Sequence, residues 1–409
     1  MSATALPIKK TKNNPDHIGL KGTLLVTSTL TVMAGSTIAP ALPALTEAFA
    51  TIPNINFVIR LVLTLPALFI AIGAPIAGYI VDRFGRKPLL VSATILYAFA
   101  GSAGYLIDNI WVLLMTRALL GIAVAGIMTT ITTLIADYYS GEKRSSFLGI
   151  QGAFSGLGGV VFLSLGGVLA DIGWRTPFLV YLFAFVILPF LITMIYEPTR
   201  ASVPTASKGI SSNSAKLPLG LIIFSYLTMM MSQIIFYSIP VQLPFYLEDL
   251  VSATATQSGL AIAALSLFFS IASASYGWFD RRLDHHYAML LGFLITGSGF
   301  ILISLAMGWI VLGIGLAAGG FGLGLVVPNL ITWVASGVPE VMRGRALGGV
   351  TTSLFLGQFI SPFIVTPLTN IVGAGGVYAA LGIFLLGIAI IEFALRKQIK
   401  TLTYTDLKE

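Results

Sequence analysis

The sequence predicts an all-α membrane protein in which twelve transmembrane helices form two pseudo-symmetric bundles of six, with both chain termini in the cytoplasm. Its low charge, its recurring apolar runs and one polar break near the middle predict this fold. Of its 409 residues, 56% are hydrophobic and 10% are charged, whereas soluble domains carry about 25% charged residues. So apolar a chain has too few polar side chains to cover a water-facing surface, which makes the lipid bilayer its expected environment.

Twelve apolar runs are long enough to cross a bilayer, which takes roughly 20 residues of helix. Prolines inside them, such as Pro66, Pro75 and Pro328, are compatible with membrane helices because neighbouring helices satisfy the freed backbone groups. The predicted spans lie at about residues 22–46, 54–81, 88–107, 110–137, 145–170, 175–196, 218–240, 254–279, 287–307, 309–335, 346–368 and 372–395.

The longest polar break, 197–217, is rich in Ser, Thr, Pro and Lys, a composition typical of a flexible linker. It separates one predicted bundle at 22–196 from a second at 218–395, with tails at 1–21 and 396–409. The segment "DRFGRK" in the first bundle has a degenerate copy, "DRRLDHH", at the matching place of the second. Repeats of this kind occur in one large class of membrane transporters.

The distribution of Lys and Arg predicts the orientation of the helices. If the N-terminus is cytoplasmic, 20 of the 23 basic residues fall on the cytoplasmic side, and the others are Arg60, Arg117 and Arg175. Such an imbalance follows the positive-inside rule. The membrane topology thereby explains the net charge of +7. A nucleic-acid partner is not needed to account for this charge, and we expect none. The expected location is a bacterial inner (plasma) membrane.

The composition gives little support to catalysis or metal binding. The chain has three histidines and no cysteine, which excludes a thiol nucleophile and a cysteine-ligated metal. The sequence shows neither a nucleophile–base pair nor a cluster of metal ligands. We therefore expect a protein that is not an enzyme and that needs no metal or cofactor.

The stretch "GYIVDRFGRKPLL" places four charged residues between two apolar runs. An anchor that only orients the helices needs basic residues, and it accounts neither for the acid nor for the glycines. The stretch resembles the signature loop of the major facilitator superfamily, and the twelve spans and the central linker extend this resemblance over the whole chain. The matching residues are Gly78, Asp82, Arg83, Gly85, Arg86 and Lys87.

The resemblance implies a gate at this loop. In the family the loop aspartate, here Asp82, meets the N-terminal end of the helix at 346–368, where the helix dipole favours negative charge. Arg86 is expected to pair with Asp137 at the cytoplasmic end of the span 110–137. Such contacts form when the cytoplasmic side is closed and break when it opens, as a switching element requires. The alternative is a simple positive-inside anchor.

Two arginines lie inside predicted spans, where a charge is costly and usually functional. Arg117 in "RALLGIAVAG", with Gly121 four residues on, resembles a family motif that antiporters use in proton coupling or for substrate charge. The alternative is an arginine that snorkels outward or binds a backbone carbonyl. Arg60 lies at a similar depth, and Glu47 is its candidate partner near the outer interface.

The placement of the acidic residues limits the classes of solute that we expect the protein to transport. All 16 Asp and Glu residues are expected at loops or span ends, Glu392 among those on the cytoplasmic side, and no lysine or histidine is expected mid-membrane. A proton-driven exporter of cations normally uses a buried carboxylate. Its absence favours neutral, amphipathic or anionic solutes, with Arg117 as a counter-charge, and leaves Glu47 or Asp137 as the candidate proton carrier.

The resemblance also implies a central cavity lined by the spans 22–46, 110–137, 218–240 and 309–335. Polar side chains on these spans and on two neighbouring spans are candidates for contact with the solute or for coupling. Each is equally well explained as a hydrogen bond between helices. These residues are Gln151, Gln233, Tyr237, Asn329, Trp333 and Gln358.

We therefore expect a monomeric secondary transporter that works by alternating access. Export of small amphipathic organic compounds, with protons as the candidate coupling ion, is favoured by "GWRTPF" and "GQFISP", which resemble stretches of drug and metabolite exporters. The alternative is a facilitator or importer of a neutral or anionic metabolite, which the missing acid favours. A channel or a receptor would not need the gate at Asp82 and Arg86.

Overall fold

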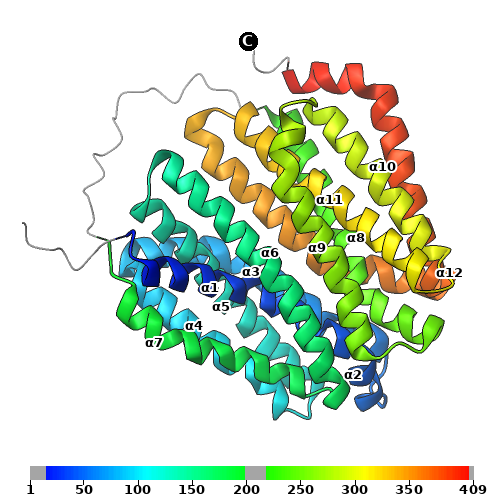
Figure 1. Ribbon diagram of the computed structural model, residues 1–409, viewed down its shortest axis with the longest axis horizontal. Helices are drawn as coiled ribbons and strands as arrows, with labels where there is room; N and C mark the ends of the chain where they lie inside the picture. Colours follow the sequence, from blue (N-terminus) through cyan, green and yellow to red (C-terminus); the bar gives the residue numbers. More distant parts are fainter. Residues whose placement is uncertain (1–14, 199–217, 405–409) are drawn as a thin grey trace, which may run out of the picture.

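The computed structural model describes residues 15–198 and 218–404, and its regular elements in these ranges are all helical (Figure 1). The predicted linker from 199 on and parts of both tails lie outside the described residues. The first half contains α1 (Ile18–Ser36), η1 (Ala39–Ala41), α2 (Leu42–Ala48), α3 (Ile55–Phe84), α4 (Arg86–Ser102), η2 (Ala103–Tyr105), α5 (Ile110–Tyr138), α6 (Gly141–Ile172), η3 (Thr176–Leu182) and α7 (Phe183–Met194). The second half contains α8 (Leu219–Val251), α9 (Ala255–Asp280), α10 (His285–Ser304), α11 (Trp309–Gly337) and α12 (Glu340–Tyr404).

Within these described ranges, eleven helical segments are long and apolar enough to cross a bilayer. The last of them, Met342–Ala394, has 53 residues, which is about 80 Å of helix against a hydrocarbon core of about 30 Å. Gly373 interrupts its helical dihedral angles, with φ at 77° and ψ at 170°. A division at this glycine would give two crossings, so the count of twelve spans and the cytoplasmic termini stay our predictions.

Local sequence signals fix several helix ends. Asn109 caps α5 by accepting hydrogen bonds from the backbone N–H groups of Trp111 and Val112. Thr254 and Gln257 form a capping box at the start of α9. Each arrangement satisfies backbone donors that have no partner within the helix, which positions the start of both helices for the contacts described below.

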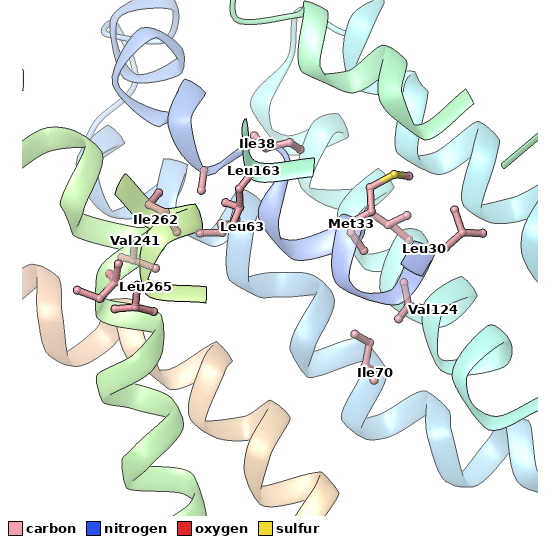
Figure 2. Packing of buried hydrophobic residues seen from close by; sticks show 14 of the residues in the cluster. Leu30, Met33, Ile38, Leu63, Ile70, Val124, Leu163, Val241, Ile262 and Leu265 are labelled. Atoms are coloured by element: carbon pink, nitrogen blue, oxygen red, sulfur yellow. The ribbon is translucent and has the colours of Figure 1, made fainter. Parts of the chain in front are cut away.

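Each half of the chain packs into its own bundle. In the first, α3 and α4 pack along α5, and in the second, α10 packs along α11 and α12. The halves meet mainly through α6 with α9 and through α3 with α12. Figure 2 shows part of the buried core, in which Leu63 and Leu163 of the first half lie near Val241, Ile262 and Leu265 of the second.

Large apolar side chains remain exposed on the outside of both bundles. Examples are Phe99, Met115, Val161, Ile383 and Ile390. A soluble monomer rarely exposes so much apolar surface. The arrangement fits a protein whose outer surface is covered by lipid chains.

Candidate functional site

One glycine shapes the loop between α3 and α4. Gly85 has a φ of 98°, in the left-handed region that residues with a Cβ rarely adopt. The carboxylate of Glu197, just after α7, accepts hydrogen bonds from the backbone N–H groups of Arg86 (2.7 Å) and Lys87 (2.8 Å). A Cβ at Gly85 would lie 2.9 Å from Glu197 Oε1. The glycine thus allows Glu197 to cap α4, where the helix dipole favours an anion.

Arg86 also joins α4 to α5. Its Nε lies 2.9 Å from Asp137 Oδ2, and the two side chains are 16% and 29% exposed. The Lys87 ammonium donates to the Ile192 carbonyl of α7. These contacts tie the ends of α5 and α7 to the start of α4. We call Arg86, Asp137 and Glu197 the loop latch.

The remaining residues predicted for the gate lie around the end of α3. Asp82 and Arg83 are exposed, and Arg83 donates to the hydroxyl of Tyr79 at 3.0 Å. A Cβ at Gly78 would meet nothing within 4 Å, so close packing does not require a glycine there in this conformation. The approach of Asp82 to the start of α12 stays a prediction.

Arg117 is fully buried inside the first bundle. Its terminal NH2 group donates to the carbonyls of Ala100 and Gly101, both at 2.7 Å. The guanidinium also lies over the rings of Phe178 and Tyr181. This is the carbonyl-bound arrangement considered as the alternative above. In this conformation Arg117 has no exposed surface with which to contact a solute.

At the other end of α6, Asp171 joins the two halves. The helix rises about 1.5 Å per residue, so this end lies about 45 Å from the start of α6 near the loop latch. The Asp171 carboxylate accepts hydrogen bonds from the backbone N–H groups of Ala255 (2.8 Å) and Thr256 (3.2 Å), and from the Thr256 hydroxyl. Asp171 thereby caps α9 of the second half. We call these three residues the α6–α9 cap.

Two glycines bring the backbones of α6 and α9 into contact beside this cap. A Cβ at Gly259 would lie 2.6 Å from the Leu163 carbonyl oxygen and 3.2 Å from Gly167 Cα. A Cβ at Gly167 would lie 2.6 Å from the Ala255 carbonyl oxygen. Because neither place has room for a side chain, glycine permits this close approach.

Arg60 makes a further contact between the halves. Its side chain is 4% exposed, and its NH2 donates to Gln242 Oε1 of α8 at 2.7 Å. It also donates to the Asn56 carbonyl and lies over the ring of Phe245. Glu47, the expected partner, is exposed at the end of α2. A neutral amide therefore takes the place that we expected for a carboxylate.

Some of the predicted solute contacts lie close to one another, and others do not. Gln358 of α12 donates to Gln233 of α8 at 3.2 Å. The hydroxyl of Tyr237 approaches Gly35 of α1, where a Cβ would lie 2.7 Å from it, so this side chain reaches across to the first half. Gln151 is partly exposed on α6. All four of these polar side chains are neutral.

Asn329 and Trp333 of α11 are instead buried within the second bundle. Asn329 Oδ1 accepts a hydrogen bond from the Tyr276 hydroxyl, and its amide nitrogen donates to the His285 carbonyl. These bonds connect α11 to α9 and α10, which is the helix-to-helix alternative for Asn329. Trp333 stacks on the His285 ring with a centroid distance of 5.6 Å.

His286 and Glu392 lie near helix ends, in the first turn of α10 and in the last part of α12, and the sequence did not single them out as a pair. Both are buried, at 4% and 5% exposed, in α10 and α12. His286 Nδ1 lies 3.7 Å from Glu392 Oε1. The sequence did not indicate this contact, because burial at a span end depends on which helix packs against it.

Three residues with structural roles at these sites were not singled out from the sequence: Glu197, Asp171 and Gln242. The capping box at 254–257 marks the start of α9, but it does not identify the acid on α6 that reaches the same helix end. Across residues 15–198 and 218–404, no three His, Asp or Glu side chains gather in a way that could hold a metal ion.

Comparisons with known proteins agree with this architecture. The model of the Major Facilitator Superfamily matches residues 24–250 and 222–404. The class C tetracycline resistance protein of Escherichia coli is 28% identical over 367 residues, which cover 84% of this chain and 88% of that protein. A multi-drug resistance efflux pump PmrA homolog of Lactococcus lactis is 24% identical, over 81% of this chain and 84% of its own length.

Solved transporter structures share the fold. A D-xylose–proton symporter matches with a TM-score of 0.74 at 16% identity, over 91% of this chain and 96% of its own. A bacterial homolog of the human lysosomal transporter Spinster matches with a TM-score of 0.77 at 14% identity, over 97% and 98%. With its long apolar helices, the protein is a multi-pass integral membrane protein and a secondary transporter, and the chain belongs to the Major Facilitator Superfamily.

Proposed function

We propose that the protein exports small amphipathic organic compounds across a bacterial inner membrane by alternating access. The observation that carries this proposal is the seam between α6 and α9. There Asp171 caps a helix of the opposite half, and Gly259 brings the two backbones into contact. Such a seam acts as a closed gate on the outer side. The direction of transport is supported by relatives named for tetracycline resistance and multi-drug efflux.

The loop latch belongs to the second gate, on the cytoplasmic side. The Arg86–Asp137 pair fixes the start of α4 against α5, and Glu197 fixes it against the end of α7. These contacts would hold the loop between α3 and α4 in place. Asp82 would then contact the start of α12 when the two halves close on the cytoplasmic side. Rocking of the units 22–196 and 218–395 would then open one gate as it closes the other, as alternating access requires.

The chemistry of the candidate cavity residues favours solutes without a positive charge. Gln233, Gln358 and Tyr237 offer amide and hydroxyl groups near the meeting of the two halves. Arg117 is bonded to backbone carbonyls, and Glu392 is buried in the second bundle. Neutral amphipathic compounds suit such a lining, because they need apolar contact and a few hydrogen bonds.

Protons are the coupling ion in this proposal, and the transporter works as a monomer in the lipid bilayer without a cofactor. Glu47 and Asp137 are proton carriers suggested by their place at helix ends. Import or facilitated passage of an anionic metabolite is the second candidate. One observation favours it: the buried arginines Arg60 and Arg117 donate hydrogen bonds to neutral amide and carbonyl oxygens, so these bonds do not balance the charge of either guanidinium.

An accumulation assay in cells that lack their own drug pumps tests the direction and the coupling together. We expect cells that produce the protein to retain less tetracycline and less of a neutral amphipathic dye than cells with an empty vector. An ionophore that collapses the proton gradient should remove the difference. An Asp137→Asn variant, checked for equal amount in the membrane, is the control for gating.

Two results would contradict export. Higher retention of an anionic solute in the producing cells would support the importer. Equal retention of every neutral, anionic and cationic solute tested, with the protein present in the membrane, would count against transport of amphipathic compounds.

A further inference from the structure

We propose that His286 and Glu392 form a proton-binding site inside the second bundle, separate from both gates. His286 lies in the first turn of α10 and Glu392 lies in the last part of α12. The two side chains are 4% and 6% exposed, and His286 Nδ1 lies 3.7 Å from Glu392 Oε1. The site deepens the proposed proton-coupled export, and its role in transport rests on that proposal.

The pair has no other polar partner among the described residues. Both ring nitrogens of His286 and both carboxylate oxygens of Glu392 are buried without a hydrogen bond. A buried carboxylate in this situation is costly, because no hydrogen-bond donor of the described residues stabilises its charge. Without an extra proton the pair carries one negative charge, and with one proton it carries none. Binding a proton therefore removes the unbalanced negative charge of the pair.

The pair combines a carboxylate with an imidazole, and either group can carry the proton. Histidine is the side chain that ordinarily changes its charge between about pH 5 and 8. A carboxylate 3.7 Å away supplies the opposite charge that a buried imidazolium needs, since a buried charge is tolerated when it is paired. The two groups can therefore share one proton, carried either by the carboxyl group or by the imidazole.

The acidic group of α9 faces the adjacent histidine, His285, instead of His286. On α9, Asp280 Oδ1 lies 3.9 Å from His285 Nδ1. On α11, the neutral Asn329 lies 2.9 Å from the same nitrogen. On α12, Glu392 faces His286. The two consecutive histidines therefore have different acidic neighbours, and only His286 is enclosed with its acid.

A tryptophan connects this site to the helices predicted to line the cavity. The Trp333 ring of α11 meets the His286 ring edge to face at 4.6 Å and stacks on the His285 ring at 5.6 Å. Phe224 of α8 lies 5.6 Å from the same indole. A proton on His286 thus changes the charge directly beside the aromatic contact that joins α8 to α11.

The fluorescence of Trp333 tests the proposal without a transport assay, because an imidazolium ring in contact with indole quenches its emission. The signal of Trp333 is the difference between the purified protein and its Trp333→Phe variant, followed from about pH 8.5 down to about pH 5. We expect this emission to fall on acidification. His285→Gln removes the other imidazole that stacks on Trp333, and this variant should retain a fall. In the His285→Gln background, His286→Gln and Glu392→Gln should each abolish it.

Glu392→Gln keeps the size of the side chain, so a folded variant is expected, and each variant is compared only if it elutes as one species at the wild-type volume. The absence of a fall in the wild type would overturn the proposal. So would a fall that survives both His286→Gln and Glu392→Gln in the His285→Gln background, or one that His285→Gln by itself abolishes. A fall that depends on His286, in a protein without proton-coupled export, would keep the site and refute the proposed function.

Discussion

Replacing Gly259 by alanine should open the α6–α9 end of the protein. The added Cβ would lie 2.6 Å from the Leu163 carbonyl oxygen, 3.2 Å from Gly167 Cα and 3.3 Å from Pro40. The first two are backbone atoms, which cannot swing aside like the end of a long side chain. The two helices must therefore separate, which weakens the hydrogen bonds of the α6–α9 cap.

The size of the effect follows from the close contact. Overpacking of this kind costs about 1 to 3 kcal/mol, and the cost falls on the conformation in which this end is closed. Since about 1.4 kcal/mol is a factor of ten in an equilibrium, the ratio of open to closed protein should rise about 5- to 150-fold. Gly277→Ala, also in α9, is the matched control, because a Cβ there meets nothing within 4 Å.

The chain contains no cysteine, so a single introduced thiol reports opening without background. Leu163→Cys places the thiol at the seam, where the native side chain is 2% exposed (Figure 2). Its rate of reaction with a water-soluble maleimide follows the open population. Gly259→Ala should raise this rate by about 5- to 150-fold, whereas Gly277→Ala should leave it unchanged.

Equal labelling rates in the Gly259→Ala and Gly277→Ala proteins would refute the reasoning that the α6–α9 contact closes this end. A rise in both would point to general loosening of α9 instead. Size-exclusion profiles of both variants show whether the protein is still folded when it is labelled.

Further predictions concern the loop, the buried arginine and alkaline pH. Gly85→Ala places a Cβ in the left-handed region and against Glu197, so it should cost about 1 to 3 kcal/mol of stability and lower the melting temperature, whereas Gly78→Ala should not. Arg117→Met leaves two buried carbonyls unpaired and should cost about 1 to 3 kcal/mol for each; its affinity for an anionic solute should stay unchanged, and a lost affinity would instead assign Arg117 to binding. Burial raises the pKa of Tyr139 to about 12 from an ordinary value of about 10. The resulting stability is complete below about pH 10 and is lost as the pH rises through about 12, so the wild type should lose stability against Tyr139→Phe in this window. Parallel alkaline melting curves would contradict that assignment.

The helices were predictable because a membrane span requires a long apolar run, which hydropathy detects directly. Their interruptions were harder to predict. The span predicted at 22–46 is divided, because α1 ends at Ser36 and Pro40 and Pro43 lie in the short helices that follow. The last helix continues to Tyr404, past the predicted end at 395. The predicted division between 368 and 372 lies beside Gly373, where the helical dihedral angles of α12 are interrupted.

The candidate site was predictable only where a motif places charge at a known helix end. The expected pairing of Arg86 with Asp137 came from the family resemblance, and their gating role stays a prediction. The contact of Asp171 with α9, and that of His286 with Glu392, join residues 84 and 106 positions apart in the chain. Contacts between residues so far apart in the chain depend on how the helices pack. Hydropathy and local motifs do not report this packing.

The exposed position of Asp171 has a consequence for the speed of the transport cycle. A hydrogen bond to a charged group contributes about 1.5 to 3 kcal/mol, but here water can hydrate the carboxylate as soon as the helix end moves away. In the proposed cycle, this exposure would let the seam reopen after each closure. Sealing one of these bonds from water would leave about 1.5 to 3 kcal/mol to be lost on reopening, which would slow reopening about 10- to 150-fold. Under the proposed mechanism, hydration of the Asp171 carboxylate would thus help to set the turnover rate.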